Sequence, residues 1–317
     1  MKRPVVVIPT NRPDKFNEWL HNWKNVLQGC HLIVVYDGDT IAIDTTIMPE
    51  GFSYQVFTWN DIDNDLGKDS WIIPRRSDCV RSYGFLKALE CNPLFIITLD
   101  DDTKPIGNTI EEHYTVLFGN KKQLRHNANY YNTMSTMLPR GYLHDLKSTV
   151  FDEVMLSHGV WYGTPDLDAF TQITDYKNST NLDFNRGIIP KNAYFSMCGM
   201  NIAFKPEVTK YLYFGLQGKN YPIDRCGDIW AGYYFSQNNE DYYAVTGFAP
   251  VIHDRASNPW TNLIKETNSV EMGELFIKYL CNKESIDEKL PYYEYFNKLV
   301  EAYNIWERLC NERLERS

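Results

Sequence analysis

Short apolar runs alternate with helix-like patterns along the first third of the chain. The runs are rich in β-branched residues, and between them apolar residues recur at the three- and four-residue steps of an amphipathic helix. The predicted strands are residues 5–8, 31–36, 54–58 and 94–99, and the predicted helices are residues 15–27 and 75–89. This order predicts an α/β fold built on a Rossmann-like parallel sheet.

The pattern becomes less regular after residue 120. Residues 120–192 are rich in Asn, Tyr and Thr, and we expect them to form loops over one edge of the sheet. Two further strands, at residues 197–204 and 242–253, flank a predicted helix at residues 224–236. From residue 259 onward helical spacing returns, which predicts one α/β domain over residues 1–258 and a helical appendage over residues 259–317 packed on it. The apolar stripe of the last helix covers either its own domain or a second copy of the chain, so a homo-oligomer stays possible.

Composition narrows the class of partner. The 317 residues carry a net charge of -9, without a cluster of Lys and Arg that reverses the sign locally, so neither nucleic acid nor an anionic membrane is an expected partner. An anionic small molecule remains possible, because a metal ion and a few arginines can overturn the global sign within one pocket. The chain has no apolar run long enough to cross a bilayer and no signal-peptide pattern. With seven scattered cysteines, none spaced as C-x-x-C, we expect a cytoplasmic protein.

Three adjacent carboxylates, Asp100, Asp101 and Asp102, follow the apolar run at residues 94–99. Ionised groups this close repel each other by about 4 kcal/mol at a near-surface dielectric, so we expect a cation among them. Oxygen ligands favour Mg²⁺ or Mn²⁺, and in extended backbone Asp100 and Asp102 point to one side while Asp101 points to the other. The alternative is a plain acidic turn, with residues 103–107 supplying the turn residues.

Polar loops follow two other predicted strands as well. They are Thr10-Asn11-Arg12 after the first strand and Asp37-Gly38-Asp39 after the second. Because the carboxyl ends of parallel strands meet at one edge of a sheet, we expect these loops and the Asp triplet to form one ligand site.

Several short motifs, in the same order along nearly the whole chain, resemble those of one protein family. They include Val7-Ile8-Pro9-Thr10, Asp37-Gly38-Asp39, the Asp triplet, Ser157-His158-Gly159, Thr164-Pro165-Asp166-Leu167-Asp168, Met197-Cys198-Gly199-Met200-Asn201, Pro222-Ile223-Asp224-Arg225 and Asp228-Ile229-Trp230-Ala231-Gly232. This series resembles the reversibly glycosylated polypeptides of plants, which are also called UDP-arabinopyranose mutases.

The resemblance implies a GT-A-type nucleotide-sugar glycosyltransferase fold. It also implies a metal-dependent interconversion of UDP-arabinopyranose and UDP-arabinofuranose, and labelling of the protein by sugar from a UDP-sugar. Two other functions stay open. An ordinary glycosyltransferase would pass the sugar from the UDP-sugar to a separate acceptor, and a nucleotide-sugar-binding scaffold would keep the fold without catalysis.

The resemblance also implies roles for single residues. Asp37 would hold the uracil, Asp102 would be the principal Mn²⁺ or Mg²⁺ ligand, and Asp100 would lie toward the ribose or the sugar and the metal. His253 would complete the metal shell, although a strand-end His bonded to its own loop is the alternative. The full set expected to bind the nucleotide is Thr10, Arg12, Asp37, Asp39, Arg81, Asp100, Asp101 and His158.

Arg140, in the sequence Arg140-Gly141-Tyr142, matches the arginine that family members glycosylate. A guanidinium keeps its proton far above neutral pH and is a poor nucleophile. Either Asp168 or Asp228 assists its attack on the sugar, or Arg140 is an electrostatic clamp on the departing diphosphate. The chain departs from the family at Lys147, where a second arginine is usual, and at Gly227, where a second Asp is usual. Aromatic residues such as Trp161, Tyr162, Trp230 and Tyr233 either exclude water from the site or belong to the core.

Overall fold

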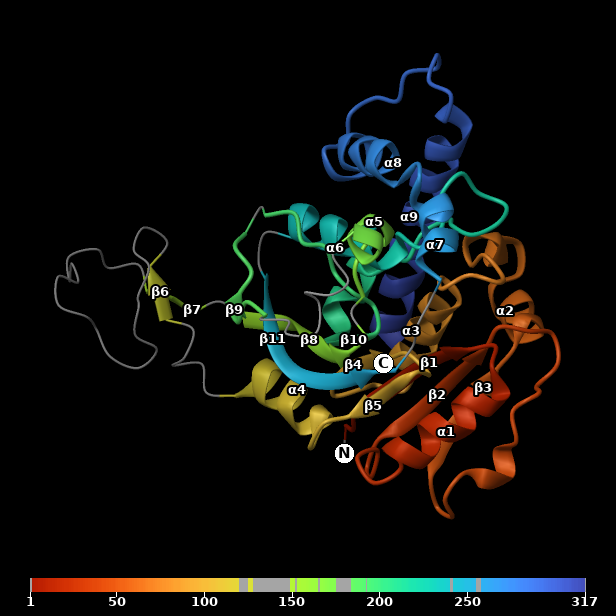
Figure 1. The fold of residues 1–317 in the computed structure, drawn as a ribbon, viewed down its shortest axis with the longest axis vertical. Coiled ribbons are helices and arrows are strands. Elements are labelled where there is room, and N and C mark those ends of the chain that lie inside the picture. The colour runs from red at the N-terminus through yellow and green to blue at the C-terminus, as the bar shows by residue number, and fades with distance from the viewer. Residues whose placement is uncertain are drawn as a thin grey trace.

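The computed structural model describes residues 2–119, 125–127, 149–151, 153–164, 166–174, 184–191, 193–239, 242–254 and 258–316. One large mixed sheet crosses the molecule, with helices on both faces (Figure 1). Helices α1 (Pro13–Trp23) and α4 (Thr109–Phe118) pack on one face, and α3 (Val80–Glu90), α6 (Gly227–Asn238) and α9 (Tyr293–Arg316) pack on the other. The predicted α/β class is confirmed.

Half of the sheet is parallel, as predicted. Strands β3 (Ser53–Phe57), β2 (His31–Tyr36), β1 (Val5–Thr10) and β4 (Ile96–Leu99) lie side by side in that order and run in the same direction. Strands β1 and β4 are buried almost throughout, which is why their sequences read as continuous apolar runs. Their carboxyl ends, and that of β2, therefore lie along a single edge of the sheet.

The other half of the sheet is mixed, and it contains the strands predicted at residues 197–204 and 242–253. Strand β10 (Asn201–Phe204) runs antiparallel to both β4 and β8 (Glu153–Gly163), while β11 (Tyr242–His253) runs parallel to β8. Short β5 (Thr103–Pro105) closes this side antiparallel to β11. Strand β9 (Gly187–Ile188) pairs with β11, and β6 (Arg125–Asn127) pairs with β7 (Thr149–Phe151).

Strand β8 corrects the expectation that residues 120–192 form only loops. Its pattern is interrupted by polar residues, but they are buried in a hydrogen-bond network. His113 of α4 is fully buried, and its two ring nitrogens lie 2.8 Å from Ser157 Oγ and 2.9 Å from Asn201 Oδ1. Asn201 Nδ2 in turn donates to the Ala249 carbonyl at 2.7 Å, so the network joins α4 to three strands. Removal from water lowers the pKa of His113 to about 4.

The connection between β3 and β4 is more complex than the single helix predicted at residues 75–89. Helix α2 (Trp59–Leu66) begins with a capping box between Thr58 and Asp61, and a 3₁₀ helix follows at Gly67–Ile72. Pro74 disfavours helical backbone in the residue before it, and α3 begins only at Val80.

Helix α3 lies unusually close to the parallel half of the sheet. A Cβ atom on Gly84 would sit 2.4 Å from Val7 Cγ1 and 2.9 Å from Val35 Cγ2. The missing side chain thus allows the helix to rest directly on β1 and β2, and it brings Arg81, one turn earlier, close to the end of β4.

Helices also account for most of the end of the chain. They are α7 (Pro259–Glu266), α8 (Ser269–Phe276), a π-helical turn at Ile277–Cys281, and α9. Two short helices come earlier in the chain, α5 (Ala169–Thr174) and a 3₁₀ helix at Pro206–Tyr211. The stripe of α9 is covered by its own chain: Trp306 is fully buried and stacks on Tyr213 with ring centroids 5.3 Å apart. The division into two domains at residue 258 stays a prediction.

Candidate active site at the carboxyl edge of the sheet

The polar loops after β1, β2 and β4 meet, as predicted. Thr10 Oγ1 donates a 2.6 Å hydrogen bond to Asp101 Oδ2, which ties the loop after β1 to the Asp triplet. The Asp37 N–H donates to the Thr10 carbonyl at 2.8 Å, which ties the loop after β2 to the same point. These contacts fix three loops against one another at a single edge.

Two arginines supply positive charge to the triplet. Arg12 bonds Asp101, and its Nη2 donates to Asp102 Oδ2 at 3.0 Å, while Arg81 Nη2 donates to Asp100 Oδ1 at 2.6 Å. Removal from water raises the pKa of Asp101, although Thr10 and Arg12 oppose this by stabilising the carboxylate. Repulsion among the three carboxylates therefore does not by itself require a metal ion.

A stronger indication of a metal site is the pair formed by Asp102 and His253. His253 Nε2 lies 3.8 Å from Asp102 Oδ1, and both side chains are buried. Pairing of β5 with β11 puts Thr103 opposite His253, which explains the proximity. His253 Nδ1 donates to the Thr164 carbonyl at 2.8 Å, so in the neutral ring it is Nε2 that carries the lone pair and faces the carboxylate. Many metal-binding histidines are held in this way.

The pair fits a divalent ion that is bound together with a substrate. Within the part of the chain that the structure describes, no group of three His, Cys, Asp or Glu side chains is arranged to hold a metal ion. Mg²⁺ commonly binds to one or two carboxylates and completes its shell with phosphate oxygens and water. The residues present match that kind of site better than a cage made wholly of protein. Because Asp100 is bonded to Arg81, its role as a further ligand stays a prediction.

Asp37 has a well-defined setting at the end of β2. Its Oδ1 accepts hydrogen bonds from Trp59 Nε1 at 2.7 Å and from the Arg76 backbone N–H at 2.9 Å. The Arg76 guanidinium lies over the Trp59 ring, 5.6 Å from its centroid. Removal from water raises the pKa of Asp37, and these N–H groups oppose the shift. Asp39 is exposed, and its carbonyl accepts a hydrogen bond from Asn60 Nδ2 at 3.1 Å.

Arg81 uses all five of its N–H donors inside the protein. Nε donates to Asp78 Oδ1 at 2.8 Å, and Nη2 is shared between Asp78 and Asp100. Nη1 donates to Thr98 Oγ1 at 3.2 Å and to the Gly199 carbonyl at 2.6 Å. Burial disfavours the charge, but Asp78 and Asp100 outweigh it and raise the pKa of Arg81. With its donors occupied, Arg81 joins parts of the site to one another.

Asp228, in the first turn of α6, is the strongest candidate for proton transfer. Its Oδ2 accepts a 2.8 Å hydrogen bond from the Gly199 N–H. Removal from water raises the pKa of Asp228 to about 7, with a further contribution from the negative charges of Asp78 and Asp166. Gly199 and Arg81 oppose the shift only in part. A carboxyl group that titrates near neutral pH can serve as either acid or base.

Comparison with known proteins assigns the chain to a family. The family model described as "Reversibly glycosylated polypeptide" matches residues 3–289. The chain belongs to the reversibly glycosylated polypeptide family. It is 33% identical to UDP-arabinopyranose mutase 1 of Arabidopsis thaliana, over 95% of this chain and 90% of that protein. It is 32% identical to probable UDP-arabinopyranose mutase 1 of Pisum sativum, over 97% and 90% of the two chains.

Solved structures offer a more distant likeness. The fold is similar to that of glucosyl-3-phosphoglycerate synthase from Mycobacterium tuberculosis in complex with Mn²⁺, UDP and glucosyl-3-phosphoglycerate, with a TM-score of 0.47 and 11% sequence identity. The match covers 89% of this chain and 80% of that one.

Among the helices that the structure describes, none combines the length and apolar character needed to span a membrane.

Other residues that family resemblance selected lie in different settings. His158 is buried, its Nδ1 lies 2.9 Å from Thr246 Oγ1, and its Nε2 accepts from the Cys198 N–H at 3.1 Å. Removal from water lowers the pKa of His158 to about 3, which favours a neutral structural ring. Asp168 is exposed and caps the start of α5, where it accepts two hydrogen bonds from Thr171. Arg140 and Lys147 lie outside the described residues.

The expected aromatic shield divides into two groups. Trp230 is buried and stacks on Phe276 of α8, with ring centroids 4.5 Å apart, so it belongs to the core. Tyr162 is 38% exposed and contacts Phe184 edge-on at 5.9 Å, so it can approach a ligand. Trp161 contacts Phe184 too, whereas Tyr233 packs against Tyr194.

The sequence alone did not identify several residues of the site. Asp78, Trp59 and Arg76 contact Arg81 or Asp37, and Asp166 accepts a 3.1 Å hydrogen bond from the Cys198 thiol beside Asp228. The run Arg75-Arg76-Ser77-Asp78, just before α3, was an available signal for Arg76 and Asp78, because charged residues there enter the edge at which the strands end.

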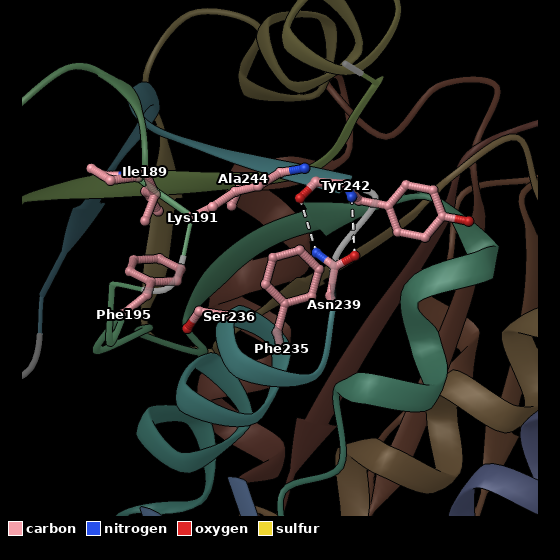
Figure 2. Close-up of a pocket in the computed structure, with 9 residues that line it drawn as sticks. Ile189, Lys191, Phe195, Phe235, Ser236, Asn239, Tyr242 and Ala244 are labelled. Atoms are coloured by element: carbon pink, nitrogen blue, oxygen red, sulfur yellow. Dashed lines mark hydrogen bonds between the residues drawn. The ribbon is translucent and has the colours of Figure 1, made fainter. Parts of the chain in front are cut away.

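A small hollow lies away from this edge, at the opposite end of β11 from His253. Figure 2 shows its walls, which come from the end of α6, the start of β11 and the segment around Lys191. Asn239 and Tyr242 exchange two hydrogen bonds beside it, of 2.9 and 3.0 Å. Its lining shares no residue with the cluster around the Asp triplet, so it is not part of the candidate active site.

Proposed function

We propose that this chain is a UDP-arabinopyranose mutase that interconverts UDP-arabinopyranose and UDP-arabinofuranose. Membership of the family and the names of its relatives support this activity. One structural observation supports this activity at the level of single residues. Asp102 and His253, which are far apart in sequence, lie close together beside the loops that contain Asp37 and Asp101. The parallel half of the sheet and this edge suit a GT-A-type nucleotide-sugar site.

Nucleotide binding would follow the edge of the sheet. Asp37, oriented by Trp59 and Arg76, would accept the N3–H of uracil, and the diphosphate would lie toward Asp102 and His253. Mn²⁺ or Mg²⁺ held by Asp102 and His253 would stabilise the negative charge that develops on the diphosphate when the bond to the anomeric carbon breaks.

Asp228 would move the proton that ring contraction requires. As the O4–C1 bond forms, O4 loses its proton, and as the O5–C1 bond breaks, O5 gains one. A carboxyl group with a pKa of about 7 can donate the proton that O5 gains and take up the proton that O4 loses, without either state being rare at neutral pH. UDP must stay bound while the ring recloses, so the site must exclude water.

A single reaction mixture separates a mutase from an ordinary glycosyltransferase. Purified protein with Mn²⁺ and UDP-arabinopyranose, but without an acceptor, is expected to yield UDP-arabinofuranose with no net release of UDP, which chromatography can follow. Release of UDP that occurs only after an acceptor is added would instead support the transferase.

Self-glycosylation at Arg140 is part of this proposal. Incubation with radiolabelled UDP-sugar and peptide mass spectrometry should locate the label on Arg140 and show its loss in Arg140→Ala. Arg140→Lys separates the two roles, because an electrostatic clamp keeps part of its effect with Lys while a guanidinium adduct cannot form. Label found on another residue would refute the covalent role.

We also propose a cytoplasmic location. All seven cysteines are free thiols and six of them are buried, an arrangement that suits a reducing compartment better than a secreted one. Fractionation of cells that express the tagged chain would test it, and recovery with secreted or membrane material would oppose it.

A further inference from the structure

Asp228 and Arg81 are connected through one glycine. The Gly199 N–H donates to Asp228 Oδ2 at 2.8 Å, and the Gly199 carbonyl accepts from Arg81 Nη1 at 2.6 Å. A Cβ atom on residue 199 would lie 3.1 Å from Asp228 Cβ and 2.9 Å from Phe214 Cε2, so only glycine lets this backbone come so close. The position of the Asp228 carboxyl group therefore depends on where the Arg81 guanidinium is held.

Arg81 is itself held by two carboxylates. Asp78 accepts from both Nε and Nη2, and Asp100 accepts from Nη2 at 2.6 Å. The Arg81 side chain is only 3% exposed, whereas those of Asp78 and Asp100 are 35% and 30% exposed. The two carboxylates outweigh the single charge of the guanidinium, so the cluster as a whole does not favour ionisation of a neighbouring carboxyl group.

We propose that Asp78 and Arg81 are positioning residues for Asp228. Arg81 fixes the Gly199 carbonyl, Gly199 fixes the Asp228 carboxyl group, and Asp78 offsets the charge of Arg81, so that Asp228 keeps its proton until a substrate hydroxyl exchanges with it. The part that concerns catalysis rests on the proposed mutase function, but the electrostatic part concerns the protein alone.

Other groups around Asp228 also affect its ionisation in the protein without ligand. Asp78 and Arg81 approach from α3 and the loop before it, Asp166 from the loop before α5, Cys198 from the loop before β10, and Cys226 from the residue before α6. Asp78 and Asp166 disfavour ionisation of Asp228, and Arg81 favours it. The two cysteines carry no charge at neutral pH, because removal from water raises the pKa of each thiol. Removing the charge of Asp78 should therefore make Asp228 more acidic.

The test is a titration of Asp228 in the protein without ligand. Carboxyl ¹³C NMR of Asp-labelled protein, with the Asp228 signal assigned by its loss in Asp228→Asn, should give a midpoint near 7 in the wild type. We expect Asp78→Asn to shift this midpoint down by about one pH unit or more, a tenfold change in proton affinity. Asp78→Glu, which keeps the charge, should leave it near the wild-type value.

The matched control is Asp63→Asn. Asp63 also pairs with an arginine, Arg75, at 2.7 Å, but its side chain is 59% exposed on α2, and its variant should leave the midpoint unchanged. An unchanged midpoint in folded Asp78→Asn, or equal shifts in Asp78→Asn and Asp78→Glu, would overturn the proposal. If Asp78→Asn does not fold, Asp100→Asn removes a carboxylate from the same guanidinium and must lower the midpoint too, or the proposal fails.

Activity separates this inference from the proposed function. Where mutase activity is present, the alkaline limb of the kcat profile should move with the midpoint in Asp78→Asn. A shifted midpoint in a protein without mutase activity would uphold the positioning role and refute the proposed reaction.

Discussion

His253 Nε2 faces Asp102 Oδ1 at 3.8 Å, with its other ring nitrogen bonded to the Thr164 carbonyl. We predict that this pair binds the divalent metal ion. We expect His253→Gln to weaken Mn²⁺ binding by at least about tenfold in the presence of UDP, because loss of a mere outer-shell partner already costs 10–100-fold. Calorimetry with Mn²⁺ measures it, and His21→Gln, an exposed histidine on α1, is the control. Equal Mn²⁺ affinity in His253→Gln would place the ion elsewhere.

Trp59 should act on nucleotide binding through Asp37. Trp59→Phe keeps an aromatic ring near Arg76 but removes the N–H that donates to Asp37 Oδ1 at 2.7 Å. A hydrogen bond to a charged group contributes about 1.5–3 kcal/mol, so we expect UDP affinity to fall roughly tenfold or more. Fluorescence or calorimetric titration with UDP measures the change. An exposed aromatic residue on α7 supplies the control, Trp260→Phe, which should bind UDP as the wild type does.

Activity should depend on the protonation of Asp228. Because removal from water raises the pKa of this group to about 7, its protonated fraction falls as the pH rises through 7. A step that needs the acid form loses rate in that range. Asp228→Asn should lower kcat by about 10²–10⁴-fold and remove the limb near pH 7 from what activity remains. A variant that kept the limb would show that another group produces it.

The His113 network should make stability depend on acid. The folded pKa of His113 is about 4 and the unfolded value is about 6.5, so the unfolded chain binds more protons between these pH values. The stability that neutral His113 contributes is present above pH 6.5 and is lost as the pH falls toward 4. His113→Gln should cost about 1–3 kcal/mol at pH 7 through its lost hydrogen bonds, and the gap to the wild type should narrow toward pH 4.5.

Urea unfolding at several pH values measures this gap. His158 and Asp228 titrate in both proteins, so their contributions cancel in the difference. His21→Gln should leave the gap near zero at every pH. A gap for His113→Gln that stayed constant with pH would mean that His113 is not kept neutral by burial.

The parallel half of the fold was predictable because three of its strands, β1, β2 and β4, are buried on both faces. Each reads as an unbroken apolar run, and the polar loops that follow β1, β2 and β4 necessarily meet at one edge. Strand β8 was not predictable in the same way. Its Ser157 and His158 look like loop residues in sequence, yet each is buried because a partner from another element satisfies its polar atoms.

The site was predictable only in part, for a related reason. Asp37 and Asp102 lie in the loops that follow β2 and β4, and His253 ends β11, so their place followed from topology. Asp78 precedes a helix, and its role depends on Arg81, which in turn depends on a glycine 118 positions later in the chain. No local pattern encodes that contact. The repulsion among the three Asp carboxylates correctly predicted positive charge beside them. It could not distinguish arginine side chains from a metal ion.

The close packing of helix α3 on the sheet has a consequence for substitutions at residue 84. Gly84 leaves no clearance between α3 and Val7 or Val35. A single methyl group at residue 84 would lift the helix by part of an ångström, and Arg81 would rise with it, away from Thr98 and Gly199. Substitutions at residue 84 would then reduce activity as substitutions in the active site do, although Gly84 packs on Val7 and Val35.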